Sequence, residues 1–291
     1  MDIAKAADVA IRNVQKEGLT DIFDRPFEVD MLSEEDFRDC VRKSIIKSIE
    51  AGGLSGLGVN GIDHVLLPKS SPFSFRRCAL MHPMDTLKYF TLVLTIADTI
   101  EKARIPIQKK RIYSYRFKLN KGYIFNKHYT ITAFKNMTAR KAKRKNTRLV
   151  VSCDIANFYD RLNLHRLENT LLSIGCERSK VKLINELLLF WSGRDSYGLP
   201  VGSNASRILA EASLIGVDVY LESMGVDFIR FVDDYRIFAS DAHTAHYWLT
   251  LLIDRLWQEG LAINTGKTKI ESCEKFKTKG AKEQPEPKGQ K

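Results

Sequence analysis

The feature that most constrains this chain is a pair of adjacent aspartates between two short apolar segments. Residues 228–232 precede Asp233 and Asp234, and residues 235–238 follow them. Two apolar runs separated by turn-forming residues predict a tight antiparallel hairpin with the acids at its tip. Adjacent carboxylates repel one another unless a cation lies beside them. The pair therefore indicates either an ordinary hairpin turn, where aspartate is common, or ligands for a metal ion.

A third aspartate lies at the end of another apolar run. Asp154 directly follows residues 149–153, which are typical of a buried strand. An ionised carboxylate there is unfavourable unless a cation or hydrogen bonds compensate it, and Asp154 taken alone is also consistent with a structural role. Two-metal phosphoryl transfer uses carboxylates from separate strands around ions about 3.5–4 Å apart. Asp154, Asp233 and Asp234 are thus predicted to hold two Mg²⁺ ions, with Mn²⁺ as an alternative metal.

Hydrophobic periodicity predicts the remaining helices and strands. The expected helices are 4–16, 34–49, one opening at Pro83, 162–172, 205–224 and 243–259. The expected strands are 62–67 and 73–81, which form a hairpin, then 112–117, 149–153, the two segments around the acid pair, and 261–263. This order predicts an α+β fold, with an antiparallel sheet backed by helices. Residues 273–291 are poor in apolar side chains and are predicted to be a disordered basic tail.

The chain of 291 residues is basic, with a formal net charge of +11 and a pI of about 9.3. Such a surface attracts phosphate backbones, although it is also compatible with a merely soluble basic protein. Residues 135–148 carry a run of cations that indicates either a solvated face or a groove that follows phosphates. The five cysteines form no CxxC pair, and neither an export signal nor an apolar stretch of about 18 residues is present. We therefore expect reduced thiols and a cytoplasmic protein without a membrane partner.

Four motifs follow one another between residues 151 and 270. They are Ser-Cys-Asp-Ile-Ala-Asn-Phe-Tyr-Asp at 152–160, Gly-Leu-Pro-Val-Gly-Ser-Asn-Ala-Ser at 198–206, Phe-Val-Asp-Asp at 231–234, and Gly-Leu-Ala-Ile-Asn at 260–264 with Lys267 and Thr268 after it. Together they resemble the palm of reverse transcriptases, which are RNA-directed DNA polymerases. The third is a variant of the usual Tyr-x-Asp-Asp. The resemblance implies a right-hand polymerase-like fold with fingers and an antiparallel palm sheet.

The resemblance also implies roles for individual residues around the metals. Asp154 and Asp233 would be the main metal ligands, with Asp234 beside them, and Ile155 would offer its backbone carbonyl to an ion. Lys267 would donate a proton to the leaving pyrophosphate, although a plain surface lysine is the alternative interpretation.

Further residues would bind the incoming nucleotide. Tyr159 would lie beneath the sugar and exclude a ribose 2′-hydroxyl, or else be a packed core aromatic. Cations on the hairpin of residues 62–81 would clamp the triphosphate, unless that hairpin is only a solvated turn. A glycine-rich loop would pack against the nascent base pair, or be a plain helix-entry turn. The residues concerned are Lys69, Arg76 and Arg77 on the hairpin, and Gly198, Pro200 and Gly202 in the loop.

Several segments point to one group within the reverse transcriptase family. Residues 18–23, 26–28, 111–117, 207–211 and 231–238 look like prokaryotic reverse transcriptases of the abortive-infection and anti-phage defence group. The resemblance divides the chain into N-terminal helices and fingers at 1–150, a palm at 151–272 and the tail at 273–291. Val201 departs from the glutamine found in many retroviral-type enzymes, so one hydrogen bond around the nucleotide is missing. Nothing after the fourth motif resembles a thumb, so we expect it to be absent or supplied by a second polypeptide or oligomer.

Three functions remain open at this point. The first is an RNA-directed DNA polymerase that takes dNTPs, an RNA template or structured RNA and a DNA product, and acts in bacterial anti-phage defence. The second is an RNA-dependent RNA polymerase, which the proposed role of Tyr159 disfavours. The third is a weakly active or inactive scaffold that binds nucleic acid within a larger complex.

Overall fold

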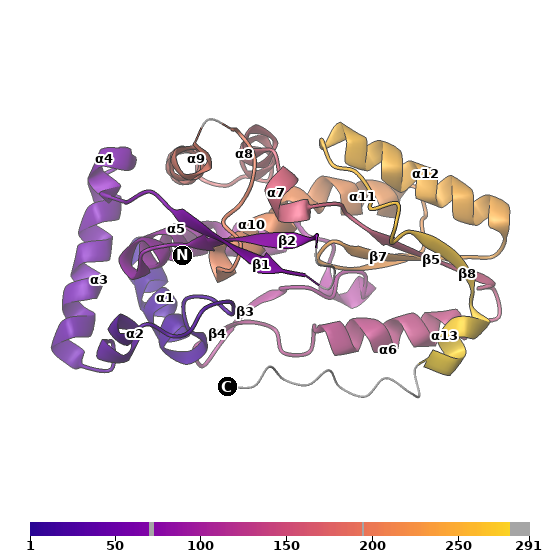
Figure 1. Ribbon diagram of the computed structural model, residues 1–291, viewed down its shortest axis with the longest axis horizontal. Helices are drawn as coiled ribbons and strands as arrows, with labels where there is room; N and C mark the ends of the chain where they lie inside the picture. The colour runs from indigo at the N-terminus through magenta and orange to yellow at the C-terminus, as the bar shows by residue number, and fades with distance from the viewer. Residues whose placement is uncertain (70–72, 194, 280–291) are drawn as a thin grey trace. The chain divides into compact units, whose positions relative to one another are not determined.

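The computed structural model describes residues 1–69, 73–193 and 195–279 (Figure 1). The chain forms two compact units, each assembled from several segments. The first contains Met1–Ile105, Tyr115–Asn126 and Asn157–Gly216, and the second contains Pro106–Ser114, Lys127–Ala156 and the residues from Val217 onward. The boundary predicted at residue 150 falls inside a strand, and each unit draws on both sides of it. As a division into fingers and palm, it stays a prediction.

The first unit is built around the buried helix α5 (Pro83–Ala103). Pro83 occupies its first turn, where a missing backbone donor is tolerated, and the His82 ring accepts a hydrogen bond from the Met84 amide at 3.3 Å. Every residue from Asp85 to Ala97 is buried, as expected for a helix enclosed on all sides. The helices that pack against it are α1 (Ile3–Glu17), α3 (Glu35–Glu50), α9 (Arg178–Ser192) and α10 (Asn204–Ser213).

The same unit carries two antiparallel hairpins and several short helices (Figure 1). The predicted hairpin of residues 62–81 is confirmed as β1 (Asp63–Pro68) and β2 (Phe75–Leu80). The second hairpin is β3 (Phe117–Asn120) with β4 (Tyr123–Phe125). The remaining helices are α2 (Phe27–Met31), α4 (Gly53–Leu57), α7 (Phe158–Arg161) and α8 (Leu164–Ser173).

The second unit contains a four-stranded antiparallel sheet in the order β6-β7-β5-β8. Its strands are β5 (Leu149–Asp154), β6 (Phe228–Phe231), β7 (Asp234–Ala239) and β8 (Lys269–Ser272). α12 (Ala242–Gln258) packs against β5 and β7, whereas α6 (Ile131–Ala142) packs against β6 and β7. The short helices η1 (Ile107–Lys109) and α13 (Glu274–Lys279) complete this unit, and α11 (Ile215–Ser223) starts at its boundary. The predicted antiparallel sheet backed by helices is therefore confirmed.

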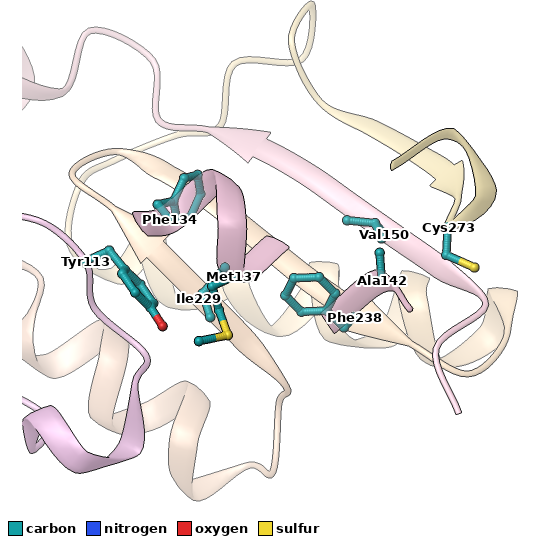
Figure 2. Packing of buried hydrophobic residues seen from close by; sticks show 8 residues of the cluster. All are labelled: Tyr113, Phe134, Met137, Ala142, Val150, Ile229, Phe238 and Cys273. Atoms are coloured by element: carbon teal, nitrogen blue, oxygen red, sulfur yellow. The ribbon is translucent and has the colours of Figure 1, made fainter. Parts of the chain in front are cut away.

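Side chains of α6 fill one face of this sheet (Figure 2). Phe134, Met137 and Ala142 of the helix cluster with Val150 of β5 and Phe238 of β7. Val151, the neighbour of Val150, is also fully buried, and successive strand side chains point to opposite faces. Both faces of β5 are consequently covered at Val150 and Val151, which explains why residues 149–151 are apolar in succession rather than alternating.

Two predicted elements differ in extent. The single helix expected at 205–224 is wrong: α10 ends at Ser213 and α11 begins at Ile215, because Leu214 leaves the helical region with φ −97° and ψ 0°. The strand expected at 261–263 is also wrong. Ile263 forms only an isolated bridge with Ile155, and the regular pairing with β5 is made by β8.

Two further expectations are corrected near the ends of elements. The strand expected at 112–117 reduces to an isolated bridge from Ile112, because Tyr115 adopts φ +41° and interrupts an extended run. The disorder predicted from residue 273 is wrong for residues 274–279, which form α13 after the buried Cys273. Residues 280–291 lie outside the described part of the chain.

The five cysteines are free thiols, of which only Cys40 is exposed. Among the described helices, none combines the length and apolar character needed to cross a membrane.

Candidate active site

The sheet of the second unit brings the three predicted acids together. Asp154, the last residue of β5, is the antiparallel partner of Asp234, the first residue of β7. The pairing of β6 with β7 leaves Val232 and Asp233 as the turn between these strands. The Asp233 carbonyl accepts a hydrogen bond from the Ile155 amide at 3.1 Å. The predicted hairpin is confirmed, and its tip lies beside the end of β5.

Two of the carboxylates are each paired with a cation. Lys267 Nζ lies 3.0 Å from Asp154 Oδ2, and Arg236 Nη1 donates to Asp234 Oδ1 at 2.9 Å. Asn264 fixes Asp154 from the backbone, since its amide donates to the Asp154 carbonyl at 2.6 Å. The Asn264 side-chain amide is 3.5 Å from Asp154 Oδ2. Lys267 is therefore placed at the acids, while its role as a proton donor stays a prediction.

Sequence reasoning assigned no role to Arg236 or Asn264. Arg236 lies two positions after Asp234 on the same strand, and alternation places both side chains on one face of the sheet. That spacing was the signal that could have identified it. Asn264 closes the fourth motif, but its contact with Asp154 depends on the isolated bridge between residues 155 and 263, which no local pattern predicts.

The electrostatics differ among the acids. Burial, followed by the negative charges of Asp154 and Asp234, raises the pKa of the Asp233 carboxyl to about 6. The hydrogen bond to Asp154 raises the pKa of the Lys267 amine, which keeps it protonated at neutral pH. The site thus holds negative charge that its own cations compensate only in part.

The donor set fits a divalent cation. Within residues 1–69, 73–193 and 195–279, no three His, Cys, Asp or Glu side chains are gathered as a ready-made metal cage. The acids nevertheless supply only oxygen donors, which suits Mg²⁺ or Mn²⁺, and the raised pKa of Asp233 shows that another positive charge would stabilise its ionised form. An ion bound here would compete with the contacts that Lys267 and Arg236 now make.

The backbone around Ile155 is partly engaged. The amides of Asn264 and Ala156 donate to the carbonyls of Asp154 and Ala262, respectively. The Ile155 carbonyl as a metal ligand stays a prediction.

A basic cavity of about 390 Å³ lies beside the acids in the second unit. Lys267 and Arg236, the two residues paired with the acids, form part of its lining. Lys135 of α6 and Lys269 of β8 add two more cations, and Glu271 is the acidic residue there. Such a cavity attracts phosphate groups.

In the first unit, part of the predicted nucleotide-binding set lines one cavity of about 630 Å³. Arg77 of β2 and the loop residues Gly198 and Pro200 all contribute to its wall. Arg77 Nη2 is 3.1 Å from His64 Nδ1 on the facing strand. Arg76 is exposed on β2, and Lys69 follows β1 directly, but neither lines this cavity.

Tyr159 lies in the short helix α7 of the same unit. Its ring packs edge-on against Phe158 at 5.6 Å between centroids, and its carbonyl accepts a hydrogen bond from the Leu199 amide at 2.9 Å. Tyr159 is half-buried, which is compatible with both interpretations of this residue.

Gly202 has a steric reason to be glycine. Its φ is +126°, and a Cβ built there would lie 2.6 Å from Thr20 Oγ1. Gly202 therefore packs tightly against Thr20 of the N-terminal segment, and it lines a different cavity from the one that Gly198 and Pro200 line.

A known protein family and two solved structures are similar to this chain. Residues 100–284 match the family described as reverse transcriptase (RNA-dependent DNA polymerase). The solved structure of apo telomerase from Candida tropicalis, truncated from its C-terminal domain, is similar with a TM-score of 0.52 and 12% identity, over 84% of this chain and 62% of that one. Telomerase from Candida albicans, in complex with a TWJ fragment of telomeric RNA, gives a TM-score of 0.52 and 12% identity, over 81% of this chain and 47% of that one.

At this identity the telomerases establish similarity of fold alone, and the chain spans 62% and 47% of their lengths. No curated protein matches the chain. The family match, however, covers more than half of the sequence and includes the acids, the turn between them and Lys267. The chain therefore belongs to the reverse transcriptase family.

Proposed function

We propose that this chain is the catalytic core of an RNA-directed DNA polymerase that transfers nucleotides from dNTPs by two-metal chemistry. The observation that carries the proposal is the register of β5 with β7, which sets Asp154 opposite Asp234 with Asp233 in the adjoining turn. Carboxylates on separate strands are the arrangement that such chemistry requires. Membership of the family supports nucleotidyl transfer as the reaction.

Asp154, Asp233 and Asp234, with the Ile155 carbonyl, are the groups that would hold the divalent ions. When bound, such ions would activate the primer 3′-hydroxyl and neutralise charge on the triphosphate. The chain itself contributes fixed positions for the acids, because two of them are anchored by paired strands and the third by the hydrogen bond from Ile155. Carboxylates held in fixed positions reduce the reorganisation of the site that is needed when charge develops in the transition state.

Lys267 would act as a general acid. Its amine is 3.0 Å from Asp154, and its raised pKa keeps a proton available at neutral pH. Donation of that proton to the departing pyrophosphate would neutralise charge on the leaving group.

Residues of the first unit would bind and select the nucleotide. Lys69, Arg76 and Arg77 would contact the triphosphate through charge-assisted hydrogen bonds. Tyr159 would exclude a 2′-hydroxyl and favour dNTPs over NTPs. The glycine-rich loop at Gly198 would contact the base pair that forms.

The partner of this core would be RNA, as template or as a structured RNA, with DNA as product. The basic cavity beside the acids and the net charge of +11 support a polyanionic partner. The segments that resemble abortive-infection enzymes support a role in bacterial anti-phage defence.

The proposal is tested by nucleotide incorporation on a primed RNA template. Wild-type protein should incorporate dNTPs in Mg²⁺, and a variant carrying both Asp233→Ala and Asp234→Ala should lose that activity. Asp254→Ala is a matched control, because Asp254 is an exposed residue of α12 in the same unit. Equal incorporation by the double variant and wild type would contradict the catalytic assignment. Replacement of Tyr159 by alanine should raise NTP use, and unchanged sugar selectivity would count against Tyr159 as the residue that excludes the 2′-hydroxyl.

The ion pairs of Asp154 and Asp234 support a second candidate, an RNA-binding scaffold without turnover. In a scaffold, Lys267 and Arg236 would remain ion-paired with Asp154 and Asp234, and no metal ion would be needed to compensate these charges. Calorimetric titration with Mg²⁺ distinguishes the polymerase from the scaffold. A polymerase should bind Mg²⁺ at this site and lose that binding when Asp154 is replaced by asparagine, whereas a scaffold need not bind Mg²⁺ there.

A further inference from the structure

The acid-bearing hairpin of β6 and β7 contains a fully buried arginine. Arg230 is a residue of β6, two positions before Val232 in the turn, and its relative exposure is 0%. Arginine is rarely buried to this degree unless its charge is paired. Its partners therefore reveal what the side chain does there.

Arg230 joins α11 to the turn. Its Nε donates to Asp218 Oδ1 at 2.9 Å and its Nη2 to Asp218 Oδ2 at 2.6 Å, so the two side chains form a bidentate pair. Its Nη1 donates to the Val232 carbonyl at 2.7 Å. The Tyr235 hydroxyl also donates to Asp218, at 3.2 Å. Asp218 is itself only 3% exposed.

Val232, whose carbonyl Arg230 binds, has an unfavourable backbone conformation. Val232 has φ +56°, a left-handed conformation that a β-branched side chain seldom adopts. Such a conformation persists only where its surroundings enforce it, and strained residues of this kind gather at functional sites. Val232 is joined by a peptide bond to Asp233, so its conformation decides where Asp233 points.

A purely stabilising role does not account for this pair. Replacing a buried ion pair by apolar side chains of similar volume is often neutral or stabilising, because desolvation offsets the attraction. An apolar replacement could not supply the hydrogen bond that Arg230 Nη1 donates to the Val232 carbonyl.

We infer that Arg230 and Asp218 are positioning residues that hold the strained Val232 turn, and thereby Asp233, in the geometry needed for metal-dependent nucleotidyl transfer. Asp218 orients the guanidinium, and Arg230 fixes the turn. Neither touches the reacting atoms. The inference rests on the proposed function for its catalytic consequence, but its structural part concerns the turn alone.

The test compares Arg230→Lys with a matched control, Arg104→Lys. Lysine keeps the charge but loses the planar fork. Arg104 lies in the first unit and has the same kind of surroundings: its Nη2 donates to the buried Glu211 at 2.5 Å, and its Nη1 donates to the carbonyl of Tyr115, whose φ is also positive. Both variants should lower the melting temperature.

Two readouts separate positioning from stability. Hydrogen exchange of the peptide containing residues 231–235 should be faster in Arg230→Lys and unchanged in Arg104→Lys, below the melting transition of each. In dNTP incorporation, Arg230→Lys should lower kcat about tenfold or more with the KM for dNTP unchanged, whereas Arg104→Lys should keep both values.

A double-mutant cycle adds a sharper criterion. Glycine adopts φ > 0 without strain, so Val232→Gly should reduce the need for the Arg230 donor. The loss of kcat caused by Arg230→Lys should then be smaller in the Val232→Gly background than in wild type.

The inference is overturned if the amide hydrogens of residues 231–235 exchange at the wild-type rate in Arg230→Lys. It is also overturned if Arg230→Lys has a lower melting temperature but the wild-type kcat. Failure of the proposed function looks different. A wild-type protein without any incorporation contradicts polymerase activity, while the exchange measurement still decides whether Arg230 holds the turn.

Discussion

At the level of single residues, the candidate site contains three carboxylates and two cations, and the charges do not fully cancel. Asp154 has Lys267 and Asp234 has Arg236, whereas Asp233 is the acid whose pKa is raised to about 6. A proton and a divalent cation would therefore compete for the same position. This competition gives a measurable link between pH and metal affinity.

We predict that Mg²⁺ binds more tightly as the pH rises from 5 to 7.5. The folded-state pKa of Asp233 lies above its ordinary value of 3.8, so the folded protein takes up a proton as the pH falls through about 6. Below that pH the proton must leave before the ion binds, and the apparent affinity at pH 5 should be about tenfold weaker. Calorimetry at the two pH values measures this. Asp233→Asn should remove the pH dependence, and equal wild-type affinities at both would argue against the assignment.

The same shift has a consequence for the metal-free protein. A carboxyl whose pKa is raised on folding favours the folded state most when it is protonated. The contribution of Asp233 to stability should therefore decrease as the pH rises from about 4 to 6 and remain low above that. Adding Mg²⁺ at pH 7.5 should raise the melting temperature of wild-type protein.

Lys267 is the candidate general acid of the site. Lys267→Gln should lower kcat by about 10²-fold, the size typical of a lost general acid, with little change in the KM for dNTP. Because the lysine side chain is 67% exposed, its ion pair contributes little to stability and the melting temperature should hardly move.

Lys275→Gln is the matched control, since the Lys275 side chain is 66% exposed, forms an ion pair with Glu271 at 3.4 Å and does not line the basic cavity. It should retain the wild-type kcat. A Lys267→Gln variant that turns over as fast as Lys275→Gln would assign Lys267 to the surface.

How much of the site the sequence predicts depends on the type of residue. Acids at strand ends stand out, because a charge beside an apolar run needs an explanation. Arg230 does not stand out, since arginine is usually exposed and nothing local shows that β6 turns this side chain into the core. Its partner Asp218 comes from a helix twelve positions earlier, a contact that only the tertiary structure creates.

At the level of elements, periodicity identified those with one clear apolar pattern. α5, the β1–β2 hairpin, β5, the β6–β7 hairpin and α12 are as predicted. The errors fall where the backbone departs from regular geometry without a glycine or proline to mark it, as at Leu214 and Tyr115. β8 was missed because only its pairing with β5, and not its own alternation, defines it.

Substitution of Gly202 tests the packing of the glycine-rich loop. Gly202→Ala should lower the melting temperature, because the new Cβ would meet Thr20 Oγ1 at 2.6 Å in a backbone conformation with φ +126°. Conformations of this kind cost about 1–3 kcal/mol for residues other than glycine. Thermal unfolding followed by circular dichroism measures the change.

Gly175→Ala provides the control for that variant. Gly175 also has a positive φ, +87°, but a Cβ there would meet no atom within 4 Å. Its melting temperature should fall less than that of Gly202→Ala. An equal fall in both would show that the contact with Thr20 adds nothing to the backbone strain.

For the molecule as a whole, the two compact units carry different parts of the proposed function. The acids, Lys267 and the positioning pair belong to the second unit, whereas the predicted nucleotide-binding residues belong to the first. The order of the four motifs predicted this family although the matched telomerase structures share only 12% identity with the chain. A fold of this kind is preserved by packing and strand register, which tolerate wide changes in sequence.

Metal rescue at Asp233 shows directly whether Asp154, Asp233 and Asp234 hold the divalent ions of nucleotidyl transfer. Asp233→Cys replaces an oxygen donor by a softer sulfur donor, which binds Mg²⁺ poorly and accepts transition metals better. We predict that this variant loses dNTP incorporation in Mg²⁺ and recovers part of it in Mn²⁺, while an Asp254→Cys control is active in both. Wild-type incorporation by Asp233→Cys in Mg²⁺ would exclude Asp233 as a metal ligand.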